Sequence, residues 1–468
     1  MNKKEFDIFK YIPSEQRLQQ AETNPNARKI FIETYGCQMN TADSQTVMAV
    51  MLDEGYAITD KLEDADVIFV NTCAVRDNAE KKIRNRLQFF NFLKKSRPNL
   101  IIGILGCMAE RLKEKLLEEE KMLDIVAGPD AYRTLPNLLK EAENGQTAVN
   151  VLLSRDENYG DISPVRKDKY NVSAFISITR GCDNVCSFCV VPYTRGRERS
   201  REPETILREL KEVQSEGFKE ITLLGQNVDK YSWNNAELNF AGLLKLTAEA
   251  APEMRIRFAT SYPLNFTDEV LYVMAKHKNI CKYIHLPVQS GSNRMLEKMR
   301  RGYTREYYLD RIKAIRSIVP DSAISTDIIT GYASETDQDH QDTLDLMEEV
   351  GFDYAFMFKY SERPNTLAAK KHPDDVAEKV KSKRLTEIIN LQQQLSLESN
   401  KQDIGKTFEV LVEGYSKKSD DYLFGRNSQN KVIVFPKRKT KPGDYVDVIV
   451  NDCTSATLLG HVLVKPYS

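Results

Sequence analysis

Short apolar runs rich in β-branched residues alternate with longer segments of helical periodicity along the first third of the chain. Such alternation is typical of a parallel sheet covered by helices. The predicted strands are residues 29–34, 67–71, 100–105 and 124–127. The predicted helices are residues 44–53, 77–95, 110–120 and 135–142.

A second alternating block follows a polar stretch at 154–170, which we interpret as a linker. Its predicted strands are residues 174–179, 220–224, 255–259, 283–287, 323–329 and 354–360. Helical segments such as 202–217 and 336–350 lie between them, and a long polar helix at 374–401 closes the block. Six strand–helix units predict an open barrel, because a closed one uses eight.

The pattern changes again from Lys406 onward, where the apolar runs become short and alternate with polar residues. These runs are residues 407–412, 422–425, 432–435, 445–450 and 457–463. Five short strands in so few residues predict a small β-barrel. The predicted fold class is α/β, with an N-terminal parallel α/β sandwich, a central open (β/α)6 barrel and a C-terminal small β-barrel. The predicted parts are a flexible leader at 1–27, domains at 28–153, 171–401 and 402–468, and the linker at 154–170.

Composition and charge limit which binding partners and which cellular compartment we expect for this protein. The 468 residues carry a formal net charge of -1, so only a local basic patch would attract nucleic acid. The N-terminus has no apolar run of the kind that marks a signal peptide. The longest apolar stretches, such as 100–109, are shorter than the roughly 20 residues of a membrane span. We therefore expect a cytoplasmic protein without membrane contact.

Three of the eight cysteines, Cys182, Cys186 and Cys189, form a C-x-x-x-C-x-x-C motif directly after the first predicted barrel strand. Three thiolates on one loop suit a [4Fe–4S] cluster whose fourth iron is left open, whereas a closed cluster takes four cysteines. An open iron can chelate S-adenosylmethionine (SAM), a source of radical chemistry. The alternative is zinc, which would need a fourth ligand that the surrounding sequence lacks.

Cys37, Cys73 and Cys107 are far apart in sequence, but each follows a predicted strand of the N-terminal sheet. Because the carboxyl ends of parallel strands share one edge, we expect these cysteines to converge there and hold a second [4Fe–4S] cluster with an open iron. The alternative is three separate buried thiols. Cys281 and Cys453 have no cysteine neighbours, and we interpret them as structural.

The sequence resembles the radical SAM methylthiotransferase family from about residue 28 to the C-terminus. The stretches that carry the resemblance are 35–40 (YGCQMN), 71–76 (NTCAVR), 106–111 (GCMAER), 180–189 (RGC to Cys189), 224–228 (LGQNV) and 285–292 (HLPVQSGS). Two loops depart from the family pattern. Residues 331–336 read GYASET where FPGET is usual, and Asn365 stands in an RPNT turn where RPGT is usual.

Residues 36–40 and 71–76 are most similar to the family branch that acts on isopentenyladenosine beside the tRNA anticodon. The resemblance implies an enzyme that inserts a methylthio group at carbon 2 of that adenine. It implies two uses of SAM, one as methyl donor to a sulfur on the N-terminal cluster and one as radical source. It also implies that the C-terminal barrel is an RNA-binding TRAM domain. Partners would be the tRNA anticodon stem-loop, an electron donor and a sulfur donor.

Four polar residues follow predicted barrel strands and would face the mouth, where they could hydrogen-bond SAM: Gln226, Asn227, Ser261 and Gln289. Asp327 lies near the end of the fifth predicted strand and could contact SAM or the substrate. Ordinary loop capping is the alternative for the first four, and a structural hydrogen bond is the alternative for Asp327. Beyond the clusters, no residue is predicted to be catalytic.

Two basic clusters are candidates for phosphate binding. One lies in the C-terminal barrel and consists of Lys431, Lys437, Arg438, Lys439 and Lys441. The other follows the cysteine loop and consists of Arg195, Arg197, Arg199 and Arg201, with Glu198 between them, while Arg300, Arg301 and Arg305 are weaker candidates. The alternative is a solvated charged face.

Two other functions stay open. The same reaction could act on threonylcarbamoyladenosine in tRNA or on an aspartate of a ribosomal protein, although residues 38–40 favour isopentenyladenosine by resemblance. A non-catalytic iron–sulfur RNA-binding protein is the third possibility, and two sets of only three cysteines argue against it.

Overall fold

The computed structural model describes residues 11–74 and 77–463, and the chain folds into two compact units. Unit 1 comprises residues 1–169, 175–183 and 191–216, and unit 2 comprises residues 170–174, 184–190 and 217–468. The two units are described separately. The predicted boundaries of the three domains and the linker stay a prediction. Residues 1–10 of the predicted leader, Val75 and Arg76, and the last five residues of the chain lie outside the described residues.

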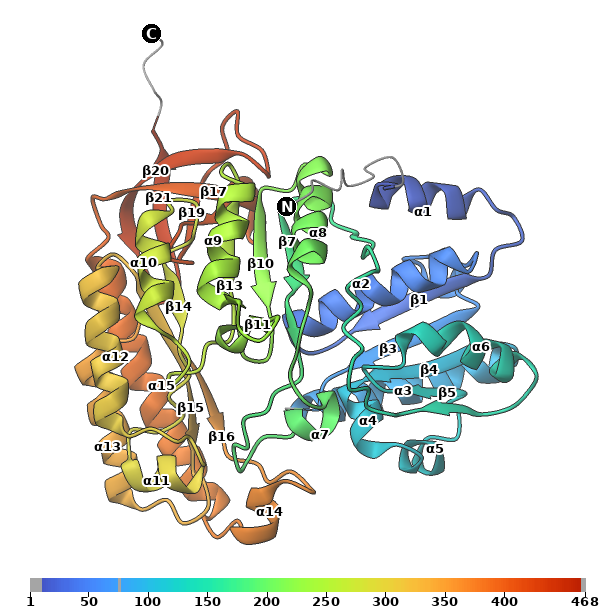
Figure 1. The fold of residues 1–468 in the computed structure, drawn as a ribbon, viewed down its shortest axis with the longest axis horizontal. Coiled ribbons are helices and arrows are strands. Elements are labelled where there is room, and N and C mark those ends of the chain that lie inside the picture. The colour runs from blue at the N-terminus through green and yellow to red at the C-terminus, as the bar shows by residue number, and fades with distance from the viewer. Residues whose placement is uncertain (1–10, 75–76, 464–468) are drawn as a thin grey trace. The chain divides into compact units, whose positions relative to one another are not determined.

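A six-stranded parallel sheet with the order β2-β1-β3-β4-β5-β6 forms the centre of unit 1 (Figure 1). Its strands are β1 (Lys29–Thr34), β2 (Ala57–Ile58), β3 (Val67–Thr72), β4 (Ile101–Gly106), β5 (Ile125–Ala127) and β6 (Ala148–Asn150). Its helices are α2 (Gln38–Asp53), α3 (Asp77–Ser96), α4 (Cys107–Leu112), α5 (Lys115–Glu119) and α6 (Leu135–Glu143).

Successive side chains of β3 point to opposite faces of the sheet, so they belong to two hydrophobic cores, one on each face. Val67 and Phe69 pack with residues of α2 and α6, whereas Ile68 and Val70 pack with residues of α3 and α4. Helices on both faces bury every residue of β3 and β4, which is why residues 67–70 and 101–106 carry no polar side chain. The predicted parallel α/β sandwich is confirmed.

Helix α1 (Ser14–Glu22) lies inside the predicted leader. Its sequence is too polar to signal a packed helix, yet Leu18 packs against the hydrophobic core of unit 1 and polar contacts add to this. Arg17 donates hydrogen bonds to the Asp53 carboxylate at 2.7 Å and to the Ser163 carbonyl at 2.9 Å.

The predicted helix at 110–120 is two helices in the structure. The chain turns at Lys113, where φ is 52°, and this turn separates α4 from α5.

The remaining elements of unit 1 flank the C-x-x-x-C-x-x-C loop. They are β8 (Thr179–Arg180), α7 (Val191–Arg195), β9 (Arg199–Ser200) and α8 (Pro203–Ser215). Strand β7 (Ser173–Ser177), the first strand of the predicted barrel, begins in unit 2 and ends in unit 1.

Unit 2 contains the other five predicted barrel strands. They are β10 (Glu220–Leu224), β13 (Arg255–Phe258), β14 (Tyr283–His285), β15 (Ala323–Thr330) and β16 (Tyr354–Lys359). β10 pairs with β13, and β14-β15-β16 form a second sheet, with parallel pairing throughout. The alternating helices are α9 (Phe240–Ala250), α10 (Asp268–Lys276), α11 (Asn293–Lys298), α12 (Arg305–Ile318), α13 (Asp337–Val350), α14 (Leu367–Lys371) and α15 (Glu378–Lys401), and a short hairpin joins β11 (Ser232–Trp233) to β12 (Leu238–Asn239).

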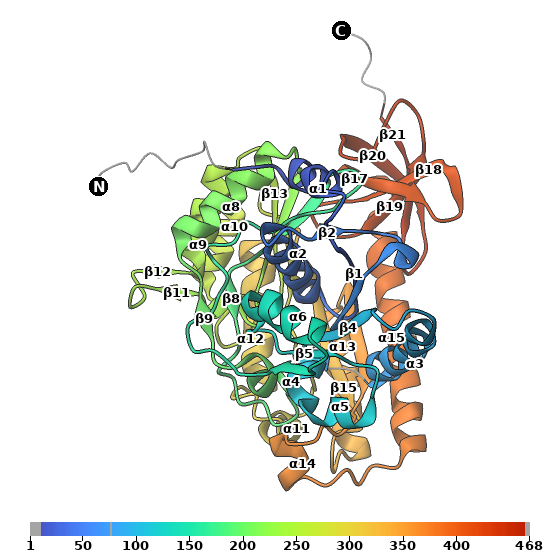
Figure 2. The same cartoon turned by 90° about the vertical axis from the view of Figure 1, so that its right-hand side faces the viewer.

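A closed five-stranded barrel follows α15, as predicted (Figure 2). Its strands are β17 (Thr407–Ser416), β18 (Ser419–Arg426), β19 (Val432–Pro436), β20 (Tyr445–Cys453) and β21 (Leu458–Val462). Inward-facing residues such as Val410, Leu423 and Phe435 fill it. In unit 2 the barrel is attached to β13, where Arg255 donates to the Arg426 carbonyl at 2.6 Å and Arg257 donates to the Asn427 carbonyl at 2.8 Å.

Candidate active site

The N-terminal sheet brings its three cysteines to one edge, as predicted. Cys37, Cys73 and Cys107 directly follow or closely follow β1, β3 and β4, which pair in register. The backbone of Gly36, which precedes Cys37, lies close to Cys73. A Cβ placed on Gly36, where φ is 118°, would lie 2.6 Å from the Cys73 Cβ and 3.4 Å from its Sγ. Burial raises the pKa of the Cys107 thiol, and the neighbouring Arg195 opposes this rise.

No group of three His, Cys, Asp or Glu side chains in the described part of the chain is placed to hold a metal ion.

Arg195, at the end of α7, lies against the N-terminal cysteines. Its Nε donates a hydrogen bond to the Cys107 Sγ at 3.2 Å, and its Nη2 donates to the Asn40 Oδ1 at 3.0 Å and to the Asp43 Oδ2 at 2.8 Å. Its Nη1 is buried and has no hydrogen-bond partner among the described residues. The prediction that Arg195 binds RNA is wrong, because its ion pair with Asp43 holds the guanidinium inside unit 1.

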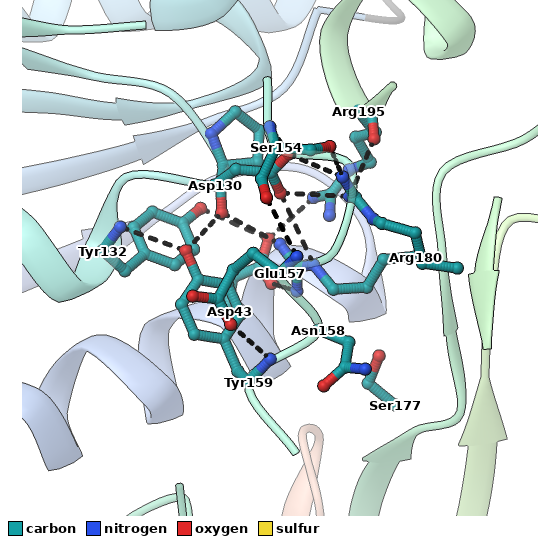
Figure 3. Close-up of polar contacts among 12 residues, drawn as sticks. Asp43, Asp130, Tyr132, Ser154, Glu157, Asn158, Tyr159, Ser177, Arg180 and Arg195 are labelled. Carbon is teal, nitrogen blue, oxygen red and sulfur yellow. Dashed lines mark hydrogen bonds and ion pairs between the residues drawn. The ribbon is translucent and has the colours of Figure 1, made fainter. Parts of the chain in front are cut away.

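Asp43 on α2 connects two arginines in the interior of unit 1 (Figure 3). Its Oδ1 accepts a hydrogen bond from Arg180 Nη1 at 2.6 Å, and its Oδ2 accepts one from the Tyr132 hydroxyl at 3.3 Å. Burial alone would raise the pKa of Asp43, but Arg180 and Arg195 together hold it below its ordinary value. The guanidinium of Arg180 also stacks over the Tyr159 ring, 4.8 Å from its centroid.

Sequence reasoning missed Asp43 and Arg180. The available signal was the position of Asp43 between residues that face the sheet, since an acid on such a face needs a buried cation. The sequence does not say which of the 67 lysines and arginines provides it.

The two ends of the C-x-x-x-C-x-x-C loop run antiparallel. β8 pairs with β9, with Thr179 opposite Ser200 and Arg180 opposite Arg199. The Cys182 backbone N–H then donates to the Gly196 carbonyl at 3.1 Å. Gly181 has a φ of 79°, and a Cβ there would lie 1.9 Å from the Arg197 carbonyl oxygen, so this crossing requires glycine.

In unit 2, Arg301 lies against the Cys186 thiol. Its Nη1 donates to the Cys186 Sγ at 3.2 Å, and its Nη2 donates to the Pro287 carbonyl at 3.0 Å. The guanidinium stacks on the Tyr262 ring at 4.5 Å and donates from Nε to the Tyr303 hydroxyl. The weaker prediction that Arg301 binds RNA is wrong, because these interactions bury it.

Four of the five predicted SAM-binding residues follow barrel strands in unit 2, and the fifth, Asp327, lies within β15. Gln226 is half-buried after β10. Asn227 is buried; its Nδ2 donates to the Asn265 Oδ1 at 3.0 Å, while its Oδ1 has no hydrogen-bond partner among the described residues. Gln289 adopts a left-handed backbone with a φ of 77°, and its N–H donates to the Asp327 carbonyl at 2.9 Å.

Ser261 and Asp327 each contact an ionisable side chain. The Ser261 hydroxyl donates to Asp229 at 3.2 Å, and burial raises the pKa of Asp229 to about 7. The Asp327 carboxylate lies 3.6 Å from His285 Nε2. The His285 ring meets the half-exposed Phe356 edge to face, 5.6 Å between centroids.

The predicted RNA patch of the C-terminal barrel is only partly exposed. Lys437, Arg438, Lys439 and Lys441 are exposed, as is Arg197 in unit 1. The prediction for Lys431 is wrong, because its ammonium is buried and pairs with Asp403 at 2.7 Å and Asp353 at 3.5 Å.

The chain matches three family models in sequence order. These are the uncharacterized protein family UPF0004 over residues 29–128, the radical SAM superfamily over residues 176–347 and the TRAM domain over residues 401–463. A radical S-adenosylmethionine methyltransferase, TsrM from Kitasatospora setae, shares the fold with a TM-score of 0.55 at 12% identity, covering 83% of this chain and 79% of its own.

Curated relatives match nearly the whole chain. The tRNA-2-methylthio-N(6)-dimethylallyladenosine synthase of Amoebophilus asiaticus is 54% identical, with 98% of this chain and 96% of the relative covered. The synthase of the same name from Chloroherpeton thalassium is 55% identical, with 95% of this chain and 98% of the relative covered. Fold and site define a radical SAM protein with a C-terminal TRAM domain. The chain belongs to the family of tRNA-2-methylthio-N(6)-dimethylallyladenosine synthases.

No helix in the described residues is long and apolar enough to cross a membrane.

Proposed function

We propose that this enzyme inserts a methylthio group at carbon 2 of isopentenyladenosine next to the tRNA anticodon, with one SAM as methyl donor and another as radical source. Family membership supports the reaction and its substrate. The single observation that carries the proposal is the pair of three-cysteine groups, one at the sheet edge of unit 1 and one on the loop after β8. We place the reaction in the cytoplasm, where its tRNA substrate is found.

Two [4Fe–4S] clusters are proposed, each with one iron free of protein ligands. Cys37, Cys73 and Cys107 would hold the first. Cys182, Cys186 and Cys189 would hold the second, on the spacing of their loop. When bound, the clusters would supply a sulfur acceptor for the methyl group and one-electron cleavage of SAM.

The described residues fit such clusters in two respects. Each group has a buried arginine that donates to one of its cysteines, Arg195 to Cys107 and Arg301 to Cys186, and donors to cluster sulfurs are a usual feature of these sites. The buried Nη1 of Arg195 also lacks an acceptor, which a cluster would provide.

We propose Gln226, Asn227, Ser261, Gln289 and Asp327 as SAM-binding residues. The free acceptor on Asn227 is the strongest support, because a buried carbonyl without a donor is costly and the SAM amino group is a donor. Asp229 would act indirectly, since it accepts from both the Ser261 hydroxyl and the Tyr262 N–H and so fixes the loop that follows β13.

We propose that the exposed cations Lys437, Arg438, Lys439 and Lys441 bind phosphates of the anticodon stem-loop. Lys437 Nζ lies over the Tyr415 ring, 4.8 Å from its centroid, which places an aromatic face beside the patch. Such combinations of cations and aromatic rings suit RNA. The reaction also needs an electron donor and a sulfur donor as partners.

The test is nucleoside mass spectrometry of bulk tRNA from cells with and without the gene. We expect methylthio-isopentenyladenosine to vanish and isopentenyladenosine to accumulate in the deletion strain. Loss of methylthio-threonylcarbamoyladenosine instead would name the sister substrate. No change in any tRNA nucleoside would contradict the tRNA reaction and direct attention to the ribosomal aspartate or to a non-catalytic role.

A further inference from the structure

The loop that carries Cys182, Cys186 and Cys189 leaves unit 1 and returns to it through a narrow neck. We use the term neck for residues 179–182 and 195–200. The β8–β9 pairing and the Cys182-to-Gly196 hydrogen bond close the neck. The position of Cys182 is therefore set by whatever holds this neck.

Arginines from both segments of the neck reach into the interior of unit 1 (Figure 3). Arg180 comes from β8 in the outgoing segment. In the returning segment, Arg195 is the last residue of α7 and Arg199 the first residue of β9. Arg180 and Arg195 share the Asp43 carboxylate, at 2.6 and 2.8 Å. Arg199 pairs with Asp130 at 2.9 Å and also donates to the Arg195 carbonyl at 3.1 Å.

These ion pairs are fixed rather than fluctuating, because they are removed from water. The side chains of Asp43, Arg180 and Arg195 are only 1%, 4% and 4% exposed. A buried charge whose partner moves away is left without solvation, so each member keeps the others in place. Exposed ion pairs would impose no such restraint.

The same carboxylate is linked to the N-terminal cysteines. Asp43 lies in the second turn of α2, whose N-cap residue is Cys37. Its partner Arg195 donates to the Cys107 Sγ. One carboxylate thus joins the helix that begins beside Cys37, the arginine that contacts Cys107 and, through Arg180 and Arg195, both segments of the neck.

We propose that Asp43 and Arg195 form an ionic clamp that fixes the neck of the Cys182 loop relative to the Cys37–Cys73–Cys107 group, and so keeps SAM cleavage coupled to sulfur insertion. Both are positioning residues in this role. The inference rests on the proposed function.

Each SAM cleavage takes one electron from a low-potential one-electron donor and yields methionine and a deoxyadenosyl radical. The radical becomes 5′-deoxyadenosine when it takes a hydrogen atom, so 5′-deoxyadenosine counts cleavage events whether or not sulfur is inserted.

The test compares the ratio of 5′-deoxyadenosine to methylthio product in the anaerobically reconstituted enzyme. Asp43→Asn removes the charge and keeps the shape, and Arg195→Lys keeps the charge and removes the fork that joins Cys107 to Asp43. We expect both variants to keep iron and sulfide content near that of the wild type and to raise the ratio at least fivefold. Spin–spin interaction between the two reduced clusters, measured by EPR, should weaken in parallel.

Glu220→Gln is the matched control. Glu220 is also buried and pairs with an arginine at 2.8 Å, Arg257, but it stands at the amino end of β10, away from the loops. This variant should lose stability without a change in the ratio. If Asp43→Asn and Arg195→Lys leave both the ratio and the spin–spin interaction unchanged with intact clusters, the clamp is wrong.

Failure of the proposed function would look different. In that case the wild type itself would form no methylthio product, or would not hold two clusters, and no ratio would exist to compare. If Asp43→Asn loses its clusters altogether, the ratio of 5′-deoxyadenosine to methylthio product in Arg195→Lys still tests the clamp. A proportional fall of both products in both variants would show a merely structural role and overturn the inference.

Discussion

The guanidinium of Arg301 donates to the Cys186 Sγ over 3.2 Å, and no carboxylate pairs with this guanidinium among the described residues. Its other partners are neutral: the Pro287 carbonyl, the Tyr303 hydroxyl and the Tyr262 ring. Arg195, by contrast, shares the carboxylate of Asp43. An unpaired buried cation beside a thiolate favours the more negative, reduced state of a cluster bound there.

Arg301→Gln should therefore lower the reduction potential of the cluster that we propose for the Cys182 loop. Glutamine keeps a donor and loses the charge. We expect the ratio of reduced to oxidised cluster at a fixed potential to fall about tenfold, equivalent to about 59 mV for a one-electron couple. Redox titration followed by EPR checks this, in protein whose Cys37, Cys73 and Cys107 are replaced by alanine so that one cluster remains.

Arg301→Lys is the control, because it retains the charge and loses the planar fork. Its potential should stay near that of the wild type. Equal shifts in both variants would mean that packing, not charge, sets the potential.

Gly181→Ala should prevent the Cys182 loop from forming. A positive φ alone costs an alanine about 1–2 kcal/mol, and here the Cβ would also lie 1.9 Å from the Arg197 carbonyl oxygen. Gly217→Ala meets the same backbone strain, with a φ of 86°, but no atom lies within 4 Å. We expect iron content to fall by about half in Gly181→Ala and to be unchanged in Gly217→Ala, as measured by iron and sulfide analysis. Full iron content in Gly181→Ala would show that the neck tolerates rearrangement.

Asp229 should make the free energy of unfolding depend on pH. Burial raises its pKa from 3.8 to about 7, so the folded state binds this proton more tightly than the unfolded state does. Its contribution to stability is thus fully present below about pH 4 and is lost as pH rises toward 7. Asp229→Asn can still accept from the Tyr262 N–H and donate to the Ser261 hydroxyl. The free energy of unfolding is measured in urea for the variant and for the wild type. We expect the value for the variant minus the value for the wild type to be higher at pH 8 than at pH 5, by on the order of 2 kcal/mol. Parallel pH profiles would contradict the assignment.

The exposed barrel cations should give RNA binding its salt dependence. Replacing Lys437, Arg438, Lys439 and Lys441 with alanine should weaken binding of an anticodon stem-loop. The slope of log affinity against log salt should become shallower by about 0.7 for each phosphate that the variant no longer neutralises. Lys431→Ala should instead reduce thermal stability and leave the slope unchanged, because its ammonium pairs with Asp353 and Asp403 inside unit 2. Fluorescence anisotropy at several salt concentrations separates the two effects.

The elements of the fold could be predicted from the sequence because apolar spacing reports burial directly. β1, β10 and the helix at Asp77–Ser96 match their predicted ranges within a residue. The start of α2 was missed, since Met39 is the only large apolar residue among residues 38–43 and the buried Asn40 and Asp43 hide the apolar spacing of a helix. The substitution of Asn365 for the usual glycine is also explained, because its φ is 70° and asparagine tolerates that conformation.

The charged residues of the site could not be placed in the same way. Arg195 and Lys431 occur in basic runs that look solvated, yet both are buried because an acid distant in sequence pairs with them. Asp43 lies 152 positions from Arg195, and periodicity carries no information about such partners. The cysteines were predictable because each follows a strand whose neighbour in the sheet was itself predictable.

The most direct test of the account is a single-turnover reaction of the anaerobically reconstituted enzyme with SAM, a one-electron reductant and a synthetic anticodon stem-loop that contains isopentenyladenosine. The account predicts methylthio-isopentenyladenosine in the digested RNA, with one 5′-deoxyadenosine and one S-adenosylhomocysteine for each nucleoside converted. It also predicts that Cys107→Ala still cleaves SAM and makes no methylthio product. Cleavage of SAM without any methylthio product in the wild type, or the same product from Cys107→Ala, would contradict the account.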